Sequence, residues 1–574
     1  MTRVSLENTV NAALKASPLT AMAWVLALAV ITVWLGLALW ANLDASSARH
    51  MLFMDELITH DGVQYIYDAE SPAHAVKAAM ENDQRYGRTT FYLSFIASTL
   101  GDAFAGEQGR IVANRMAFAL TTCAAVCVLS WALLETTFGR LLGVVAGLTV
   151  PMASYYATMP KPDPLMVLFL GLYFLAWRRN GHGFGSSMIW LGLCFGAKIA
   201  AFPAMVFLIP IVILHARITG YALTPPAIKH GGLSFLAGFL ISVPIIVSSF
   251  PNGLSYYLQQ TWMNRTHVHD EDGTGILDWI SELQTSAFFG DGPATFAVLI
   301  IFAGLIAAAV WLAAGQPKTP NSTKLAFETL FRSRYVRPFT ATICGAAMLG
   351  AIMVSTDRLW LFYLFPGALL VTLGAAAAFE RLITDTRWAP RAIRGAGLTA
   401  GSLAFAASAL AGAQFLHEDF EAAANRSTTD KFLRHQIVYE AFIREVDAYA
   451  QAADSEERLR VAFNAHFWAP QTTESVLYYP YYNAFWHWTL ELDMVALGPE
   501  QMNRMFAADP VQNLPSALEG ERLLPLHTDV GGPCTLAPCY RQIDTGAEAE
   551  GLFLFARDPG ADPQSPAFSQ DTSS

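Results

Sequence analysis

Two adjacent carboxylates, Asp55 and Glu56, follow shortly after the first long apolar segment of the chain. Carboxylates at the edge of a membrane are costly unless they are hydrated, paired with a cation or bound to a metal. Such a pair could supply a general base together with a metal ligand or a hydrogen-bonding partner. The alternative interpretation is an ordinary acidic loop.

A third carboxylate, Asp163, lies in the run Pro-Lys-Pro-Asp-Pro. Pro162 and Pro164 restrict the backbone on both sides of it and end the neighbouring helices. This rigidity suits a carboxylate that must be held in one place. The alternative is a helix-ending turn with a solvated aspartate.

Two cations could bind an anion at a membrane surface. Lys198 lies between two short apolar runs, and Arg358 precedes an aromatic run that ends in Phe365-Pro366. A lipid phosphate is the anion available there, and arginine binds phosphate through a bidentate fork. The alternatives are a lysine that extends to the interface and a weak surface pair between Asp357 and Arg358.

His267 and His269 form a His-x-His pattern followed by three acidic residues. A strand would place both imidazoles on one face, where they could bind a metal ion. A solvated acidic loop, or a lid that closes over a bound substrate, would have the same composition.

The composition indicates which elements must position these residues. Of the 574 residues, 53% are hydrophobic and 14% are charged. Soluble globular proteins carry about 25% charged residues, so a soluble enzyme and a disordered chain are both disfavoured. The net charge of −11 disfavours a nucleic-acid partner. The chain is therefore predicted to be a polytopic α-helical membrane protein.

Hydropathy predicts about eleven transmembrane helices. The predicted spans are Leu19–Trp40, Val112–Leu133, Leu141–Met159, Pro164–Trp177, two half-spans within Met188–Leu214 that turn at Lys198, Leu233–Phe250, Ala294–Ala313, Phe339–Val354, Leu359–Ala378 and Gly395–Phe415. The break at Lys198 follows from charge, because one continuous helix would place two later basic clusters outside and a lysine in mid-membrane. The N-terminus is then inside, and the candidate residues share the outer face, predicted to be the periplasmic side of a bacterial inner membrane.

The predicted domains are a membrane body over residues 1–415, a soluble α+β domain over 416–555 on the outer face, and a disordered tail over 556–574. The body includes two large outer loops, at about 42–111 and 251–293. Within the first loop, Ala73–Met80 is predicted to form a short amphipathic helix after Ser71-Pro72. Cys534 and Cys539 are either a local disulfide or two free thiols.

The order of these features resembles the GT-C glycosyltransferases that use polyprenyl-phosphate sugars, such as protein O-mannosyltransferases and lipid A aminoarabinose transferases. The resemblance covers about residues 19–415. It rests on Asp55-Glu56 after the first span, Asp163 between the third and fourth spans, the small-residue turn at Lys198, and Arg358 through Pro366. The Lys-Pro-Asp-Pro turn and the acidic C-terminal domain depart from that family's pattern.

The resemblance implies an inverting transfer of a sugar from the lipid-linked donor to an acceptor hydroxyl on a glycan, lipid or protein. It assigns Asp55 as the general base. Glu56 and Asp163 would hold a divalent metal ion (magnesium, manganese, calcium or zinc), and Lys198 and Arg358 would stabilise the departing polyprenyl phosphate. Two alternatives from other classes are a transporter or lipid flippase and a non-catalytic envelope assembly protein. The absence of charged residues from mid-span positions weakens the transporter interpretation.

Overall fold

The computed structural model describes residues 18–44, 69–81, 87–150, 152–255, 323–355, 361–384, 416–425, 458–464, 491–497, 509–517 and 540–557, with shorter pieces between them. The chain divides into two compact units. One contains residues 1–46 with 62–424, and the other contains residues 47–61 with 425–574. Each unit is considered by itself.

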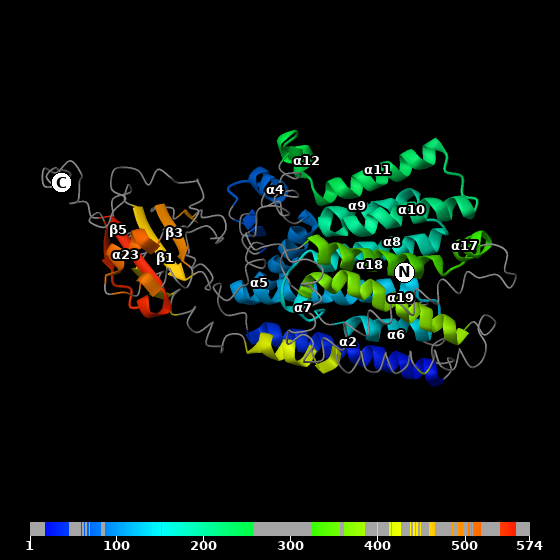
Figure 1. Ribbon diagram of the computed structural model, residues 1–574, viewed down its shortest axis with the longest axis horizontal. Helices are drawn as coiled ribbons and strands as arrows, with labels where there is room; N and C mark the ends of the chain where they lie inside the picture. The colour runs from blue at the N-terminus through cyan, green and yellow to red at the C-terminus, as the bar shows by residue number, and fades with distance from the viewer. Residues whose placement is uncertain are drawn as a thin grey trace. The chain divides into compact units, whose positions relative to one another are not determined.

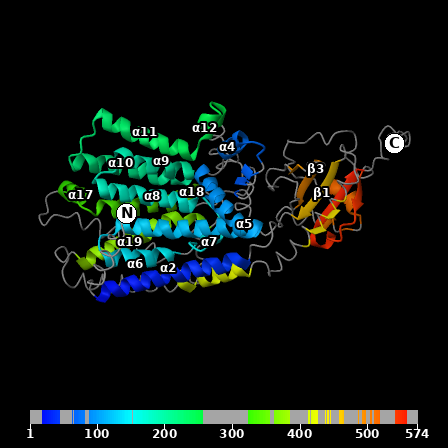
Figure 2. The same cartoon turned by 180° about the vertical axis from the view of Figure 1, so that it is seen from behind.

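The first unit is a bundle of helices (Figures 1 and 2). Its long helices are α2 (Pro18–Asp44), α5 (Arg88–Leu133), α6 (Thr137–Leu148), α8 (Asp163–Asn180), α9 (Met188–Ala197), α10 (Phe202–Ile218), α11 (Pro225–Ser242), α18 (Val336–Ser355) and α19 (Phe365–Thr384). Shorter helices are α4 (Pro72–Glu81), α7 (Tyr155–Thr158), α12 (Ile245–Ser248) and α17 (Thr323–Arg332). We call the end of the bundle where α8 begins the Asp163 end, and the end where α5 stops the Glu135 end.

The predicted break at Lys198 is confirmed. Helix α9 ends at Ala197, Lys198 has an extended backbone, and α10 begins at Phe202. At the other end of α10, the His215 ring lies 3.1 Å from the carbonyl oxygen of Gly181, just beyond α8. Because α9 runs toward the Asp163 end and α10 runs away from it, the two form an antiparallel pair. The total of eleven spans includes segments outside the described residues and stays a prediction.

Glycines allow α9 and α11 to pack closely. Helices α9 and α11 lie side by side in both views (Figures 1 and 2). A Cβ atom on Gly192 would lie 2.0 Å from the carbonyl oxygen of Phe235, and one on Gly238 would lie 2.1 Å from that of Ile189. Only glycine permits this backbone approach, which is a common packing mode between helices in lipid.

The outer surface of the bundle is apolar. On α2, Val25, Leu28 and Val33 are each more than half exposed, and Leu233 and Ile241 of α11 are exposed to a similar degree. Among the described residues, the segments Trp24–Leu43 and Gln108–Leu133 are long and apolar enough to cross a membrane. Apolar side chains directed outward along such helices suit a lipid environment.

Local sequence signals predict correctly where the short helix α4 begins. The predicted helix after Ser71 is α4, and its start is capped because the Ser71 hydroxyl accepts a hydrogen bond from the backbone N–H of His74 at 3.2 Å. Helix α5 contains a sharp turn at Ala105 and Gly106, so that Gly101 packs against the backbone of Gly109. The second of these two helical stretches corresponds to the predicted span from Val112.

The second unit contains a five-stranded mixed sheet in the order β2-β3-β1-β5-β4. Its strands are β1 (Arg458–Asn464), β2 (Phe485–Trp486), β3 (Glu491–Leu497), β4 (Tyr540–Ile543) and β5 (Leu552–Arg557). Strand β1 pairs in parallel with β3 and antiparallel with β5. Helix α23 (Pro510–Ala517) contacts β4. Cys534, Cys539 and residues 558–574 lie outside the described residues.

Candidate functional site

Asp163 and Lys198 form a buried ion pair at the Asp163 end of the bundle. The Lys198 Nζ atom lies 2.9 Å from Oδ1 and 2.8 Å from Oδ2 of Asp163. The side chains are 2% exposed for Asp163 and 15% exposed for Lys198. The interpretation of Asp163 as a solvated turn residue is therefore wrong, and the two residues that the sequence marked separately form one unit.

The chain holds both partners through local backbone constraints. Asp163 is the first residue of α8, with Pro162 before it and Pro164 in the first turn. A carboxylate at a helix N-terminus is stabilised by the exposed amide groups and the helix dipole. Lys198 has an extended backbone between α9 and α10, and its side chain reaches the start of α8.

Tyrosines and a second lysine surround the ion pair, and the sequence analysis assigned none of them. The hydroxyl of Tyr156 forms a hydrogen bond with Asp163. Lys161 is only 3% exposed, and its Nζ atom lies 5.3 Å from the ring centre of Tyr155 and 5.9 Å from that of Tyr363. Lys198 Nζ lies 5.1 Å from the same Tyr363 ring. Two ammonium groups therefore approach one aromatic ring in a poorly hydrated part of the bundle.

A buried arginine lies next to the Lys198 turn. The backbone N–H of Gly87 donates to the carbonyl oxygen of Ala197 at 3.1 Å, and a Cβ atom at Gly87 would collide with the backbone of Gly196. The following residue, Arg88, is 2% exposed, and its guanidinium lies 4.7 Å from the Phe91 ring centre. The beginning of α5 thus adds a third buried cation to this end of the bundle.

Both flanks of the Asp55 segment are fixed at the Asp163 end. Before it, the Asn42 side chain at the end of α2 donates to the carbonyl oxygen of Ala157 in α7 at 2.9 Å. After it, Gly62 packs so closely against the Phe91 ring that a Cβ atom would lie 2.3 Å from a ring carbon. The chain therefore leaves and re-enters the bundle close to the ion pair.

Several predicted site residues lie outside the described residues, and their predicted roles are untested. They are Asp55, Glu56, His267, His269 and Arg358. Within the described parts of the chain, no group of three or more histidine, cysteine, aspartate or glutamate side chains is arranged to hold a metal ion. Of the predicted set, the structure brings together Asp163 and Lys198.

Local sequence signals could have found only some of the additional residues. Lys161 lies two positions before the proline-flanked Asp163, and Tyr363 belongs to the aromatic run after Arg358. Tyr155 and Tyr156 lie within an apolar run, where aromatic residues ordinarily indicate core packing. Their role at the ion pair depends on tertiary contacts.

These features define a helical membrane protein with a buried, cation-rich site at one end of its bundle. No family model and no curated protein matches the chain. The chain is similar to two solved structures of ArnT from Cupriavidus metallidurans, one bound to undecaprenyl phosphate and one in the apo state. Both are 15% identical to it, with TM-scores of 0.45 and 0.44, and they cover 76% and 77% of this chain and 82% of the ArnT chain. At this TM-score the similarity carries no weight for function, which rests on the chain's own residues.

Proposed function

We propose that the chain is an integral-membrane glycosyltransferase that moves a sugar from a polyprenyl-phosphate donor to an acceptor hydroxyl at the Asp163 end. In this proposal that end faces the periplasm of a bacterial inner membrane. The observation that carries it is the juxtaposition, among the described residues, of two buried cations, Lys161 and Arg88, and the largely buried Lys198 with the buried carboxylate of Asp163. Such an excess of positive charge in a poorly hydrated site favours an anionic ligand, and a lipid phosphate is the anion at a membrane surface.

The proposed reaction is a single displacement at the anomeric carbon of the donor sugar. The acceptor oxygen bonds to that carbon while the bond to the phosphate oxygen breaks, and the configuration inverts. Asp55 takes the proton of the acceptor hydroxyl, and the polyprenyl phosphate leaves with the bonding electrons as a dianion. Lys198 and Arg358 stabilise the charge that develops on the departing phosphate.

The ion pair gives Asp163 a definite role in this mechanism. Both carboxylate oxygens hold the Lys198 ammonium, and Tyr156 fixes the carboxylate from another side. Asp163 therefore positions Lys198 and compensates its charge until the donor phosphate arrives. Because charge-assisted hydrogen bonds depend strongly on geometry, a prepositioned ammonium costs little reorganisation during the reaction.

The described residues do not fit a metal ion at Asp163. A carboxylate whose two oxygens already accept from a lysine is a poor ligand for a divalent cation, and among the described residues Asp163 belongs to no group of three or more metal-binding side chains. A metal ion shared with Glu56 would first have to displace Lys198. No step of the proposed reaction passes through a metal.

Donor turnover tests the proposal. Purified protein would be given a panel of polyprenyl-phosphate sugars, and release of polyprenyl phosphate would be measured. We expect Asp55→Asn to lower the rate by about 10²–10⁴, the usual contribution of a general base. The matched control is Asp68→Asn, a carboxylate of the same loop, which we expect to keep wild-type turnover. If no donor turns over and Asp55→Asn still complements a deletion strain, the transferase proposal fails in favour of a transport or assembly role.

A second set of variants tests the phosphate-binding role of Lys198 separately from folding. Lys198→Met alone leaves Asp163 buried without its cation, so it could fail to fold. The double variant with Asp163→Asn removes both charges, and we expect it to fold but to lose turnover by at least about 10²-fold. The control is Lys229→Met on exposed α11, which removes the same charge elsewhere. Full activity in a folded double variant would contradict the assignment.

A further inference from the structure

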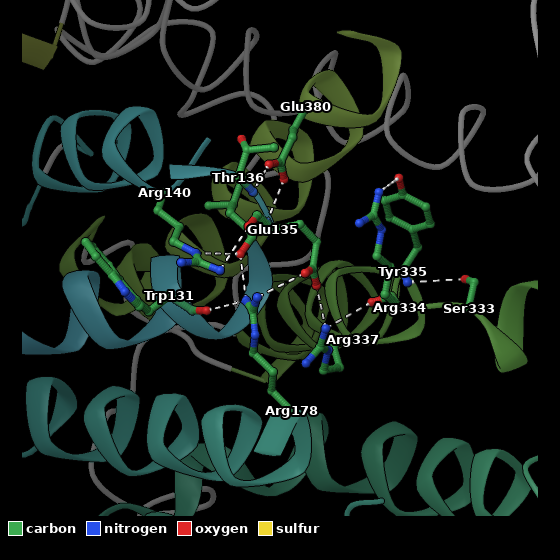
Figure 3. Close-up of polar contacts among 11 residues, drawn as sticks. Trp131, Glu135, Thr136, Arg140, Arg178, Ser333, Arg334, Tyr335, Arg337 and Glu380 are labelled. Carbon is green, nitrogen blue, oxygen red and sulfur yellow. Dashed lines mark hydrogen bonds and ion pairs between the residues drawn. The ribbon is translucent and has the colours of Figure 1, made fainter. Parts of the chain in front are cut away.

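A second cluster of charged residues closes the Glu135 end of the bundle, remote from the ion pair (Figure 3). Glu135 lies between two arginines: its Oε2 atom is 2.9 Å from Nη2 of Arg178, and its Oε1 atom is 2.6 Å from Nη2 of Arg337. Both Glu135 oxygens are therefore engaged, each by a different helix. Arg178 also donates to the carbonyl oxygens of Trp131 and Leu134, at 2.6 and 2.7 Å.

The other carboxylate of this cluster serves the backbone. Glu380, near the end of α19, accepts hydrogen bonds from the backbone N–H groups of Glu135, at 2.9 Å, and Thr136. These amides precede the first turn of α6, whose own N-cap is the Thr136 side chain, which accepts from the backbone N–H of Gly139. Glu380 therefore holds the turn between α5 and α6 from a distant helix. The negative charge of Glu380 therefore lies beside the start of α6.

Three more arginines complete the cluster; they contact carbonyl oxygens and a tyrosine, and Arg140 and Arg334 also lie in the electrostatic field of Glu135 and Glu380. Arg140 donates to the carbonyl oxygens of Leu134 and Glu135, at 3.1 and 2.9 Å. Arg334 donates to the Tyr335 hydroxyl at 3.1 Å, and the guanidiniums of Arg334 and Arg381 lie 5.1 and 4.3 Å from the Tyr335 ring centre.

Among the residues that the structure describes, the cluster therefore carries five arginines against two glutamates. It lies where α5, α6, α8, α18 and α19 begin or end, which is the depth of the lipid headgroups for helices that cross a membrane. Arg334 and its neighbour Arg332 are both exposed. An excess of arginine at helix ends on a membrane surface is suited to phosphate, because the guanidinium binds phosphate oxygens in pairs.

We propose that the Glu135 end binds the phosphate group of an anionic phospholipid, with Arg334 as the contacting residue and Arg381 beside the same Tyr335 ring. The site is separate from the proposed catalytic end and does not depend on the transferase assignment. The bound phosphate reduces the repulsion among the arginines and so stabilises the joint between α5, α6, α18 and α19.

Thermal stability of the full-length protein in detergent tests this site. We expect added phosphatidylglycerol to raise the Tm of the wild type and phosphatidylcholine to leave it unchanged. In Arg334→Gln, we expect the phosphatidylglycerol concentration for half-maximal stabilisation to rise about tenfold, which corresponds to the loss of one charge-assisted hydrogen bond. Arg332→Gln is the matched control, since it removes the same charge two residues away, and it should respond like the wild type.

The Tm measurements distinguish the source of the phosphate from the specificity of the site. Stabilisation by inorganic phosphate at millimolar concentration, without a response to phosphatidylglycerol, would support a phosphate site but overturn the lipid as its source. Equal losses in Arg334→Gln and Arg332→Gln would overturn the site, because they would show general attraction to a basic surface. Equal effects of the two lipids would overturn it as well.

Discussion

Removing one partner of the Asp163–Lys198 pair should lower the free energy of unfolding far more than removing both partners. Asp163→Asn would leave the Lys198 ammonium 15% exposed and without the carboxylate that now lies 2.8 Å away. Lys198→Met would leave a carboxylate that is 2% exposed. Removing one partner of a buried pair typically costs about 3–5 kcal/mol, because the remaining charge is desolvated without compensation.

The double variant should behave differently. With both charges absent, neither desolvation penalty remains, and neutral replacements of buried pairs are often nearly without effect. We therefore expect each single variant to lose about 3 kcal/mol of unfolding free energy and the double variant to lose less than either one. The resulting coupling energy should be about 3 kcal/mol or more, at the upper end of the range for contacting residues.

The assay is a double-mutant cycle on protein in mixed micelles, unfolded by SDS titration and followed by circular dichroism. Tyr156→Phe provides a graded comparison, since it removes one neutral hydrogen bond to Asp163 and should cost only about 1 kcal/mol. Additive losses with a coupling energy below about 1 kcal/mol would refute the reasoning, because that is the behaviour of a solvent-exposed pair.

Three further outcomes are expected. Gly192→Ala should destabilise the protein by about 1–3 kcal/mol, since its Cβ would meet backbone 2.0 Å away. Its control is Gly232→Ala on α11, where a Cβ would have nothing within 4 Å, so this variant should be neutral or slightly stabilising. Equal effects of the two variants in SDS titration would contradict this. Glu380→Gln should cost about 1 kcal/mol, because a neutral amide accepts more weakly than a carboxylate from the backbone N–H groups of Glu135 and Thr136, and the same titration measures this loss. Burial lowers the pKa of His182 below its usual 6.5, so the unfolded chain binds a proton more readily than the folded chain. The stability should therefore fall as the pH drops below about 6.5 and level off below the lowered pKa. A Tm profile between pH 8 and 5 that is the same in His182→Asn would contradict this.

The sequence predicts those parts of the site that depend on local chemistry. The prolines around Asp163 determine where α8 begins, and charge distribution places a break at Lys198 within a continuous apolar run. The start of α4 follows from Ser71-Pro72. These predictions succeed because the deciding interactions lie within a few residues of one another.

The partners of these residues could not be predicted in the same way. Asp163 and Lys198 are separated by 35 positions, and nothing local indicates that each would neutralise the other. In the sequence, Lys161 is an ordinary turn lysine, and its contacts with Tyr155 and Tyr363 arise from tertiary packing. The arrangement of the arginines of the Glu135 end around two glutamates likewise requires the packed helices.

The hydrogen bonds from the turn before α6 to Glu380 have a consequence for how the chain is made. The amides of Glu135 and Thr136 lie 245 and 244 positions before Glu380, so this turn emerges from the ribosome long before its acceptor exists. Until α19 has been inserted, these two amides must be satisfied by water or lipid headgroups at the membrane surface. The junction between α5 and α6 is therefore completed by α19, which is made later. A nascent chain arrested before residue 380 should carry a frayed and protease-accessible junction there.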